Sequence, residues 1–137
     1  MAEANNLFQV EIITVDRVFY TGEASFLEFN TVSGEMGVYK NHIPLTTVLA
    51  PGMVTIHEAD GNRIAAVHAG FAEILGDKVT LLAEIAEWPD EIDTARAEAA
   101  KKRAEKRLAS HSEEIDVKRA ELALKKALIR INAKDIV

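Results

Sequence analysis

Basic side chains at regular spacing in the last third of the chain are the residues whose chemistry stands out. Arg96 and Arg103 lie seven residues apart, and so do Arg119 and Lys126, which places each pair on one face of a helix. If the chain turns near His111, two antiparallel helices bring Arg96 opposite Lys126 and Arg103 opposite Arg119. Like charges repel across a partly dry seam. Acidic side chains, a rotation of the helices or a bound anion would offset this repulsion. A polyphosphate would suit as the anion, because guanidinium groups bind phosphate through paired hydrogen bonds.

Two acidic residues, Glu87 and Asp93, fit the same candidate site, where they would orient the amino and hydroxyl groups of a ligand. Three alternatives stay open. Asp93 and Arg96 are spaced as an i, i+3 surface pair, and charge-rich helix faces are usually solvated without any ligand. A basic hairpin also suits an acidic protein surface and, less well, a nucleic acid. The spacing alone does not decide among these four readings.

Several other kinds of site lack the residues that they require. The sequence has no cysteine, which excludes a disulfide framework, thiolate chemistry and a cysteine-bound metal. None of its four histidines is paired with another at i+3 or i+4, so a zinc site is not expected. No nucleophile elbow accompanies the serine, histidine and aspartate residues. We therefore predict a chain that acts by binding partners rather than an enzyme.

Two short segments of the first part are expected to be loops. The glycines of residues 33–37 are not followed by the Lys-Ser/Thr pair of a phosphate loop. This segment is therefore predicted to be a tight turn that exposes Glu35. His42 lies before Ile43 and Pro44, and a histidine in such a context is most often an ordinary loop residue.

The basic residues belong to a segment with the composition of a helical hairpin. Residues 90–133 contain no glycine and no proline, and strong helix formers dominate them. Pro89 and the acidic residues after it favour a helix start, and Ser112 is the expected N-cap of a second helix. The sequence predicts two antiparallel helices, over about 91–109 and 113–133. Because small alanines bury little area, we expect a hairpin that is able to leave the rest of the chain and repack against another protein.

The first part of the sequence predicts short β-strands. Apolar and polar residues alternate over 8–13, which is the period of a strand with one buried face. Asp60-Gly61-Asn62 and Gly76-Asp77 each lie between two apolar runs, a pattern typical of β-hairpins. Frequent turn signals favour an antiparallel sheet that closes on itself. We predict an N-terminal antiparallel β-sandwich or barrel over residues 1–88, followed by a C-terminal antiparallel two-helix hairpin over 89–137.

The two parts differ in charge. Residues 1–88 carry four basic and twelve acidic side chains, a net of −8, whereas residues 89–137 carry twelve and ten, a net of +2. The total of −6 argues against a protein that mainly binds nucleic acid. No apolar run approaches the ~20 residues of a membrane-spanning helix, and the polar start lacks the features of a signal peptide. We expect a cytosolic protein that reaches a membrane only through a partner.

A series of short motifs runs through the chain in a defined order. They are Ser33-Gly34-Glu35-Met36-Gly37-Val38, His42-Ile43-Pro44-Leu45, Pro51-Gly52, Gly70-Phe71-Ala72-Glu73-Ile74, Val79-Thr80-Leu81-Leu82-Ala83, Ile92-Asp93-Thr94-Ala95-Arg96-Ala97 and Lys118-Arg119-Ala120-Glu121-Leu122-Ala123. Each motif is weak alone, but their order and spacing together resemble the epsilon subunit of bacterial F-type ATP synthase. The resemblance extends from about Phe8 to Ile131.

The resemblance implies a subunit of the rotating central stalk that couples proton flow to ATP synthesis without doing chemistry. In this family the β-sandwich binds the gamma subunit and the ring of c subunits, and Glu35 and His42 match the edge that faces the ring. The hairpin either folds down on the sandwich or extends along gamma into the catalytic hexamer of alpha and beta subunits. The extended form inhibits ATP hydrolysis, and its basic residues there meet an acidic segment of beta.

The resemblance also implies a location and a set of excluded partners. A family member of this kind sits peripherally at the cytoplasmic face of the bacterial plasma membrane, without inserting into the membrane itself. It requires no cofactor and binds no nucleic acid. The coupling ion stays open, because this subunit does not bind it.

In some family members the folded hairpin binds ATP as a regulatory ligand, without a phosphate loop. The site residues that the resemblance implies are Glu87, Ile92, Asp93, Arg96, Ala97, Arg103, Lys126 and Arg130. Nucleotide-binding members often carry an arginine where this chain has Lys126. A point charge in place of a two-pronged guanidinium predicts weaker phosphate binding.

Two other classes of function stay open at the level of the sequence. A stand-alone nucleotide sensor would use the same hairpin without a rotor. A hydrolase on the β domain would need a convergent nucleophile or a set of metal ligands, which the sequence does not offer.

Overall fold

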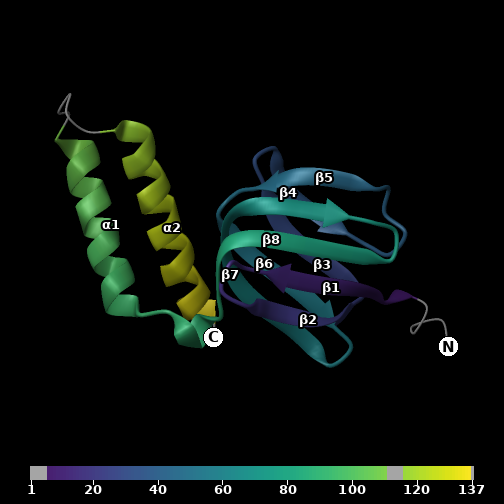
Figure 1. Ribbon diagram of the computed structural model, residues 1–137. Coiled ribbons are helices and arrows are strands. Elements are labelled where there is room, and N and C mark those ends of the chain that lie inside the picture. Colours follow the sequence, from purple (N-terminus) through teal and green to yellow (C-terminus); the bar gives the residue numbers. More distant parts are fainter. Residues whose placement is uncertain (1–5, 111–115, 137) are drawn as a thin grey trace. The chain divides into compact units, whose positions relative to one another are not determined.

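A computed structural model describes residues 6–110 and 116–136 of the chain (Figure 1). The chain divides into two compact units, Met1–Glu87 and Trp88–Val137. The first unit is built from strands and the second from helices. The serine predicted to cap the second helix, Ser112, lies outside the described residues.

The described part of the first unit forms one eight-stranded sheet that folds over into a sandwich. Its strands are β1 (Phe8–Ile13), β2 (Val18–Ala24), β3 (Phe26–Thr31), β4 (Gly34–Val38), β5 (Leu45–Leu49), β6 (Gly52–Glu58), β7 (Gly61–Ile74) and β8 (Lys78–Glu87). They follow the order β2-β1-β8-β7-β5-β3-β4, and β6 pairs with β3 and β7. The predicted β-sandwich is confirmed.

Strand β7 changes its partner halfway along its length. Its first half pairs with β6 and its second half with β5. Ala69 and Gly70 at the junction have positive φ angles, 57° and 118°, which interrupt the extended backbone. A Cβ atom on Gly70 would lie 1.9 Å from the backbone oxygen of Leu82, so only glycine fits there.

Alternate residues of the strands form the core of this unit. Phe8, Val10 and Ile12 of β1 are buried, whereas Gln9 between them is exposed, as the period of two predicted. The largest fully buried side chains include Phe29, Ile12, Leu27, Ile56, Ile74 and Leu81. Burying a side chain of this size stabilises a fold by roughly 1.5–3 kcal/mol, so these six residues contribute strongly to the stability of the sheet.

Two local features of the sheet differ from the prediction. Strands β1 and β8 pair in parallel, with Gln9 opposite Lys78, in a sheet that was expected to be antiparallel throughout. The predicted turn over residues 33–37 is wrong in its position, because Gly34–Val38 is strand β4. The turn lies at Val32 and Ser33, just before β4. There the Thr31 hydroxyl accepts a hydrogen bond from the Ser33 amide at 3.1 Å and donates one to the Gly34 carbonyl at 2.8 Å.

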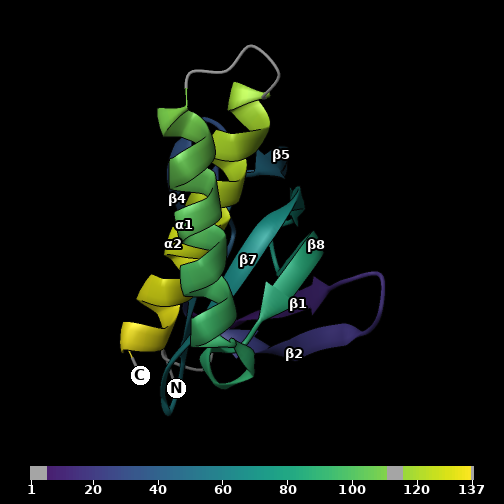
Figure 2. The same cartoon turned by 90° about the vertical axis from the view of Figure 1, so that its left-hand side faces the viewer.

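The second unit is a helical hairpin, as predicted. A short 3₁₀ helix, η2 (Pro89–Glu91), precedes α1 (Thr94–Ala109) and α2 (Val117–Ile136). The two long helices lie side by side and antiparallel in both views (Figures 1 and 2). Among the described residues, no helix is long and apolar enough to cross a membrane.

Both helices begin later than predicted, because aspartates that were expected inside the helices cap them instead. Asp93 is the N-cap of α1, which therefore starts at Thr94 and not near residue 91. The Asp116 carboxylate accepts a hydrogen bond from the Arg119 amide at 3.1 Å, and α2 starts at Val117 rather than near residue 113. An aspartate in this position satisfies an amide that has no partner within the helix.

Candidate anion-binding site

The segment Ile92–Ala97 forms the start of α1. The Asp93 Oδ1 atom accepts a hydrogen bond from the Arg96 amide at 3.1 Å. Ile92 just before the cap and Ala97 in the first turn are buried, with exposed fractions of 5% and 3%. Apolar residues at these two positions are typical of a hydrophobic staple that fixes how the chain enters a helix. Three of the motif's residues therefore have a structural role, and the Arg96 side chain is exposed.

The residues before α1 are tied to the end of α2. The Trp88 amide donates to Glu91 Oε1 at 2.9 Å, which closes the 3₁₀ turn. Lys134 of α2 donates from Nζ to the Pro89 carbonyl oxygen at 3.2 Å. The hairpin is thus held together by its own residues at the end where α1 begins.

Buried alanines form the seam between the two helices. Ala97 and Ala104 of α1, and Ala120 and Ala127 of α2, are each at most 3% exposed. The expectation that Arg96, Arg103 and Arg119 face their counterparts across a dry seam is wrong, because all three side chains are exposed. The physical reason is that burying an unpaired guanidinium is costly, whereas burying the methyl group of an alanine is favourable. Repulsion among these cations is therefore screened by solvent.

The four cations of the candidate site nevertheless lie on one face of the hairpin. Arg96 and Arg103 each directly precede a seam alanine of α1, and Lys126 directly precedes a seam alanine of α2. One residue is a rotation of about 100° around a helix. When two helices pack antiparallel, a residue that directly precedes a seam residue lies on the same face of the pair in both helices. Arg130, one turn after Lys126, joins this face and is partly buried.

Glu87, the remaining polar residue of the candidate site, ends strand β8 in the first unit. Its Oε1 atom lies 3.6 Å from Nε2 of His68, whose side chain is completely buried. Neither ring nitrogen of His68 has a hydrogen-bond partner within the described residues. No site role was predicted for His68. It directly follows the apolar run Ile64–Val67 on β7, and this position marks it in the sequence as a polar residue in a core strand.

The two residues expected at a partner-facing edge lie on and after β4. Glu35 is exposed on β4 and is paired in the sheet with Asn30. His42 is partly exposed in the following loop, where its Nδ1 atom is 2.7 Å from the Ile43 carbonyl oxygen. The neighbouring Asn41 has a φ of 67° and donates from its amide to the Gly76 carbonyl at 2.6 Å. This bond anchors the loop to the turn between β7 and β8.

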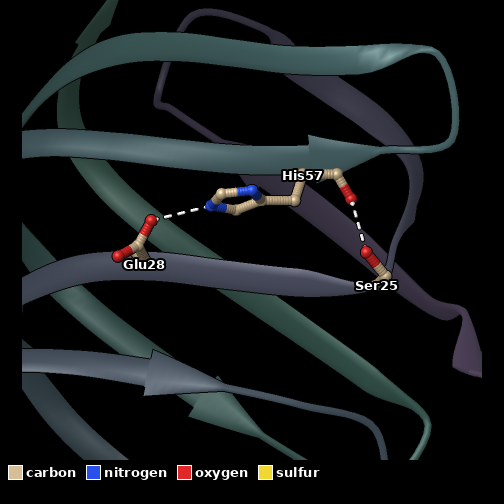
Figure 3. A network of polar contacts seen from close by, with 3 residues as sticks. All are labelled: Ser25, Glu28 and His57. Carbon is tan, nitrogen blue, oxygen red and sulfur yellow. Dashed lines mark hydrogen bonds and ion pairs between the residues drawn. The ribbon is translucent and has the colours of Figure 1, made fainter.

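A polar network on the sandwich surface was missed by the sequence analysis (Figure 3). His57 Nε2 lies 2.7 Å from Glu28 Oε2. The Ser25 hydroxyl donates to the backbone oxygen of His57 at 3.3 Å and not to its ring. The three residue types of a hydrolytic triad are present, but no activated nucleophile results, since the base does not touch the serine hydroxyl.

A second polar pair involves the phenol of Tyr20. Its hydroxyl donates to Glu58 Oε2 at 2.7 Å. Burial, followed by this hydrogen bond, raises the pKa of Tyr20 well above its usual range. The phenol therefore stays protonated near neutral pH and cannot act as a base. Among the described residues, no group of three or more His, Asp or Glu side chains is placed to hold a metal.

Comparison with known proteins gives matches over nearly the whole chain. The family model described as "ATP synthase, Delta/Epsilon chain, beta-sandwich domain" matches residues 7–89. The model described as "ATP synthase, Delta/Epsilon chain, long alpha-helix domain" matches residues 90–135. The ATP synthase epsilon chain of Brevibacillus brevis is 49% identical over 100 residues, which are 72% of this chain and 76% of the relative. That of Desulforudis audaxviator is 45% identical over 110 residues, 80% and 79% of the two chains.

Two solved structures share the fold at low sequence identity. A chain of the cryo-EM structure of the Euglena gracilis mitochondrial ATP synthase, OSCP/F1/c-ring, is similar with a TM-score of 0.80 at 22% identity, covering 92% of this chain and 80% of that one. A chain of the Tetrahymena thermophila mitochondrial ATP synthase central stalk and c-ring is similar with a TM-score of 0.59 at 12% identity, covering 93% and 96%.

Proposed function

Because the chain belongs to the delta/epsilon-chain family of ATP synthase, as an epsilon subunit and thus a non-catalytic part of the central stalk, we propose that its hairpin is a mobile brake on ATP hydrolysis that ATP holds in a folded state. The observation that carries this proposal is the gathering of Arg96, Arg103, Lys126 and Arg130 on one face of the hairpin. Such a face attracts a polyphosphate without needing a phosphate loop.

Each charged residue of the proposed site has a definable task. The guanidinium groups of Arg96 and Arg103 bind phosphate oxygens, and both are exposed. Lys126 supplies a point charge and Arg130 a second source of hydrogen bonds from the other helix. Asp93 caps α1 through Oδ1, which leaves its other oxygen able to accept a hydrogen bond from the nucleotide. Glu87 accepts another, from an amino or hydroxyl group.

The alanine seam supports a hairpin that changes its packing. Alanine side chains bury little apolar area, so separating or shifting them costs little free energy. Ligand binding to one state then decides the balance between states. A ligand present at a hundred times its Kd stabilises the state that it binds by about 2.7 kcal/mol. This is enough to hold the hairpin folded when ATP is plentiful.

The partners in this proposal follow from the family. The sandwich unit binds the gamma subunit and the c ring, with Glu35 and His42 at the contact, on the cytoplasmic face of the plasma membrane. When ATP falls, the released hairpin extends into the hexamer of alpha and beta subunits. There its cations meet an acidic segment of beta, and ATP hydrolysis stops while proton-coupled synthesis continues.

Isothermal titration calorimetry of the full chain with ATP tests the proposal. We expect Arg96→Ala to weaken ATP binding about tenfold or more, since a hydrogen bond to a charged group contributes about 1.5–3 kcal/mol. Lys102→Ala is the matched control, because Lys102 is an exposed cation of the same helix on the side away from the seam. It should change the Kd less than twofold. If millimolar ATP produces no heat and no thermal shift, the nucleotide part of the proposal is contradicted.

The brake is tested separately in a reconstituted ATPase that contains gamma. Addition of the wild-type chain should lower hydrolysis at low ATP and do so less at high ATP. Inhibition by the Arg96→Ala chain should not depend on the ATP concentration, because ATP no longer holds its hairpin folded. Equal inhibition by both chains at every ATP concentration would contradict the proposed link.

A further inference from the structure

The sequence that starts α1 is repeated at the start of α2. Ile92-Asp93-Thr94-Ala95-Arg96-Ala97 has its counterpart 23 residues later in Ile115-Asp116-Val117-Lys118-Arg119-Ala120. Identity at the same offset continues with Glu98 and Glu121, Ala100 and Ala123, Lys102 and Lys125, Ala104 and Ala127, and Arg107 and Arg130. Arg103 corresponds to Lys126, which keeps the charge. The two helices are thus variants of one pattern.

The structure repeats along with the sequence. Asp93 caps α1 by accepting from the Arg96 amide at 3.1 Å, and Asp116 accepts from the Arg119 amide at the same distance. The equivalent alanines of both helices are buried in the seam. Two like helices that pack antiparallel through equivalent residues are related by an approximate twofold axis perpendicular to both. Such an axis turns each face of the pair onto itself, so equivalent residues share a face.

This symmetry sorts the charges of the hairpin by face. The positions just before the four seam alanines are all cationic, and two further arginines, Arg107 and Arg130, each lie four residues after one of them. They are Arg96, Arg103, Arg107, Arg119, Lys126 and Arg130, which we call the cationic face. Positions just after the seam alanines lead to the opposite side, where Glu98, Glu105 and Glu121 lie. Within α1 and α2 no acidic residue lies among the six cations, whereas the N-cap carboxylates of Asp93 and Asp116 lie three residues before Arg96 and Arg119.

The proposed nucleotide site uses only part of this face. Its cations are Arg96, Arg103, Lys126 and Arg130, and the twofold axis exchanges Arg103 with Lys126. The same axis carries Arg96 onto Arg119 and Arg130 onto Arg107. Arg107 and Arg119 are exposed, and neither forms an ion pair within residues 6–110 and 116–136. The second half of the face therefore offers the same charges as the first.

We propose that Arg107 and Arg119 form a second phosphate-binding half-site with Arg103 and Lys126, so that the whole cationic face binds a linear polyphosphate longer than a triphosphate. The inference rests on the proposed phosphate-binding role of the first half. From Arg96 to Arg107 the face extends about 16 Å along α1, at 1.5 Å per residue. The two halves share their central pair of cations, so one long anion satisfies both, whereas two separate triphosphates would repel each other across that pair.

Calorimetry of the full chain with inorganic tripolyphosphate, and with a linear polyphosphate several times longer, tests this inference. We expect the longer anion to bind more tightly to the wild type. Arg119→Ala should weaken its binding about tenfold, as expected for the loss of one charge-assisted contact. Lys118→Ala is the matched control, because it removes an adjacent exposed cation that points away from the face. Thermal melting should confirm that both variants stay folded.

The outcomes separate this inference from the proposed function. If Arg96→Ala weakens ATP binding while Arg119→Ala leaves polyphosphate binding unchanged, the second half-site is absent and the ATP site stands. If ATP does not bind but polyphosphate binding depends on Arg119, the inference stands and the nucleotide proposal fails. Equal effects of Arg119→Ala and Lys118→Ala would show unspecific charge attraction and overturn the inference. Tighter, Arg119-dependent binding of a polyglutamate peptide would overturn it as well, in favour of a protein surface.

Discussion

Asp93 shows how one side chain fits two explanations of the same motif. Its carboxylate caps α1, which any helix start of this kind requires, and the nucleotide proposal gives it a second task. The repeated motif at α2 has the same cap from Asp116. The pattern Ile-Asp-x-x-Arg-Ala therefore marks a helix start first, and only the side chains around it can make it a binding site.

The two tasks of Asp93 can be separated by substitution. Asp93→Ser keeps a capping oxygen and should leave the stability of the hairpin nearly unchanged, whereas Asp93→Ala should cost about 1 kcal/mol. Both should weaken ATP binding, because both remove the carboxylate. Asp116→Ala is the control: it should cost similar stability and leave ATP affinity unchanged. Urea unfolding monitored by helicity, with calorimetry on the same samples, distinguishes these results. Unchanged ATP affinity in Asp93→Ser would limit this residue to capping.

At the scale of elements, local turn chemistry made the β-hairpins predictable. Asp60-Gly61 and Gly76-Asp77 connect strands that are neighbours in sequence, and both hairpins formed as expected. The parallel pair of β1 and β8 was not predictable, because no turn joins Gln9 to Lys78 and the pairing depends on the whole sheet. The helix starts were misplaced by a few residues for a related reason, since the choice of cap depends on which aspartate the packed helix can use.

The candidate site was only partly predictable at this scale. The cationic residues and their spacing of seven residues are visible in the sequence, and the structure keeps them on one face. The prediction that these cations lie in the seam was wrong, because a stripe of basic residues and a stripe of alanines run side by side along both helices and either could face the partner helix. Packing selects the alanines, since burying guanidinium groups without partners is costly. The sequence alone does not state which stripe the partner helix covers.

The junction in β7 gives a prediction for one element. Gly70→Ala should destabilise the sandwich by about 3 kcal/mol, since its Cβ would collide with the Leu82 backbone oxygen and the positive φ would add strain. Ala69→Gly should have the opposite sign and stabilise by roughly 0.5 kcal/mol, because relief of the left-handed conformation exceeds the added chain entropy. Urea midpoints of both variants test this. A neutral Gly70→Ala would mean that the strands shift apart at low cost.

At the scale of the whole molecule, the proposal predicts that ATP slows opening of the hairpin. Hydrogen exchange of amides in α1 should slow by up to about a hundredfold at a hundredfold excess of ATP over its Kd, by mass action. Amides in the core strands of the sandwich should not change, which provides an internal reference. Arg96→Ala should abolish the effect. Exchange in α1 that is as slow without ATP as in the sandwich core would contradict a mobile hairpin.

The parallel pairing of β1 with β8 also has a consequence for the order of events during translation. Within the described sheet, β8 joins the β1–β2 pair to β7 and the strands beyond it. A nascent chain that ends before Lys78 therefore holds the first hairpin without its bridge to the remaining strands. The sheet becomes complete only when the ribosome has made its last strand. The segment after Glu87 follows immediately in the sequence, so the helical hairpin is synthesised only after every strand of the sheet has been made.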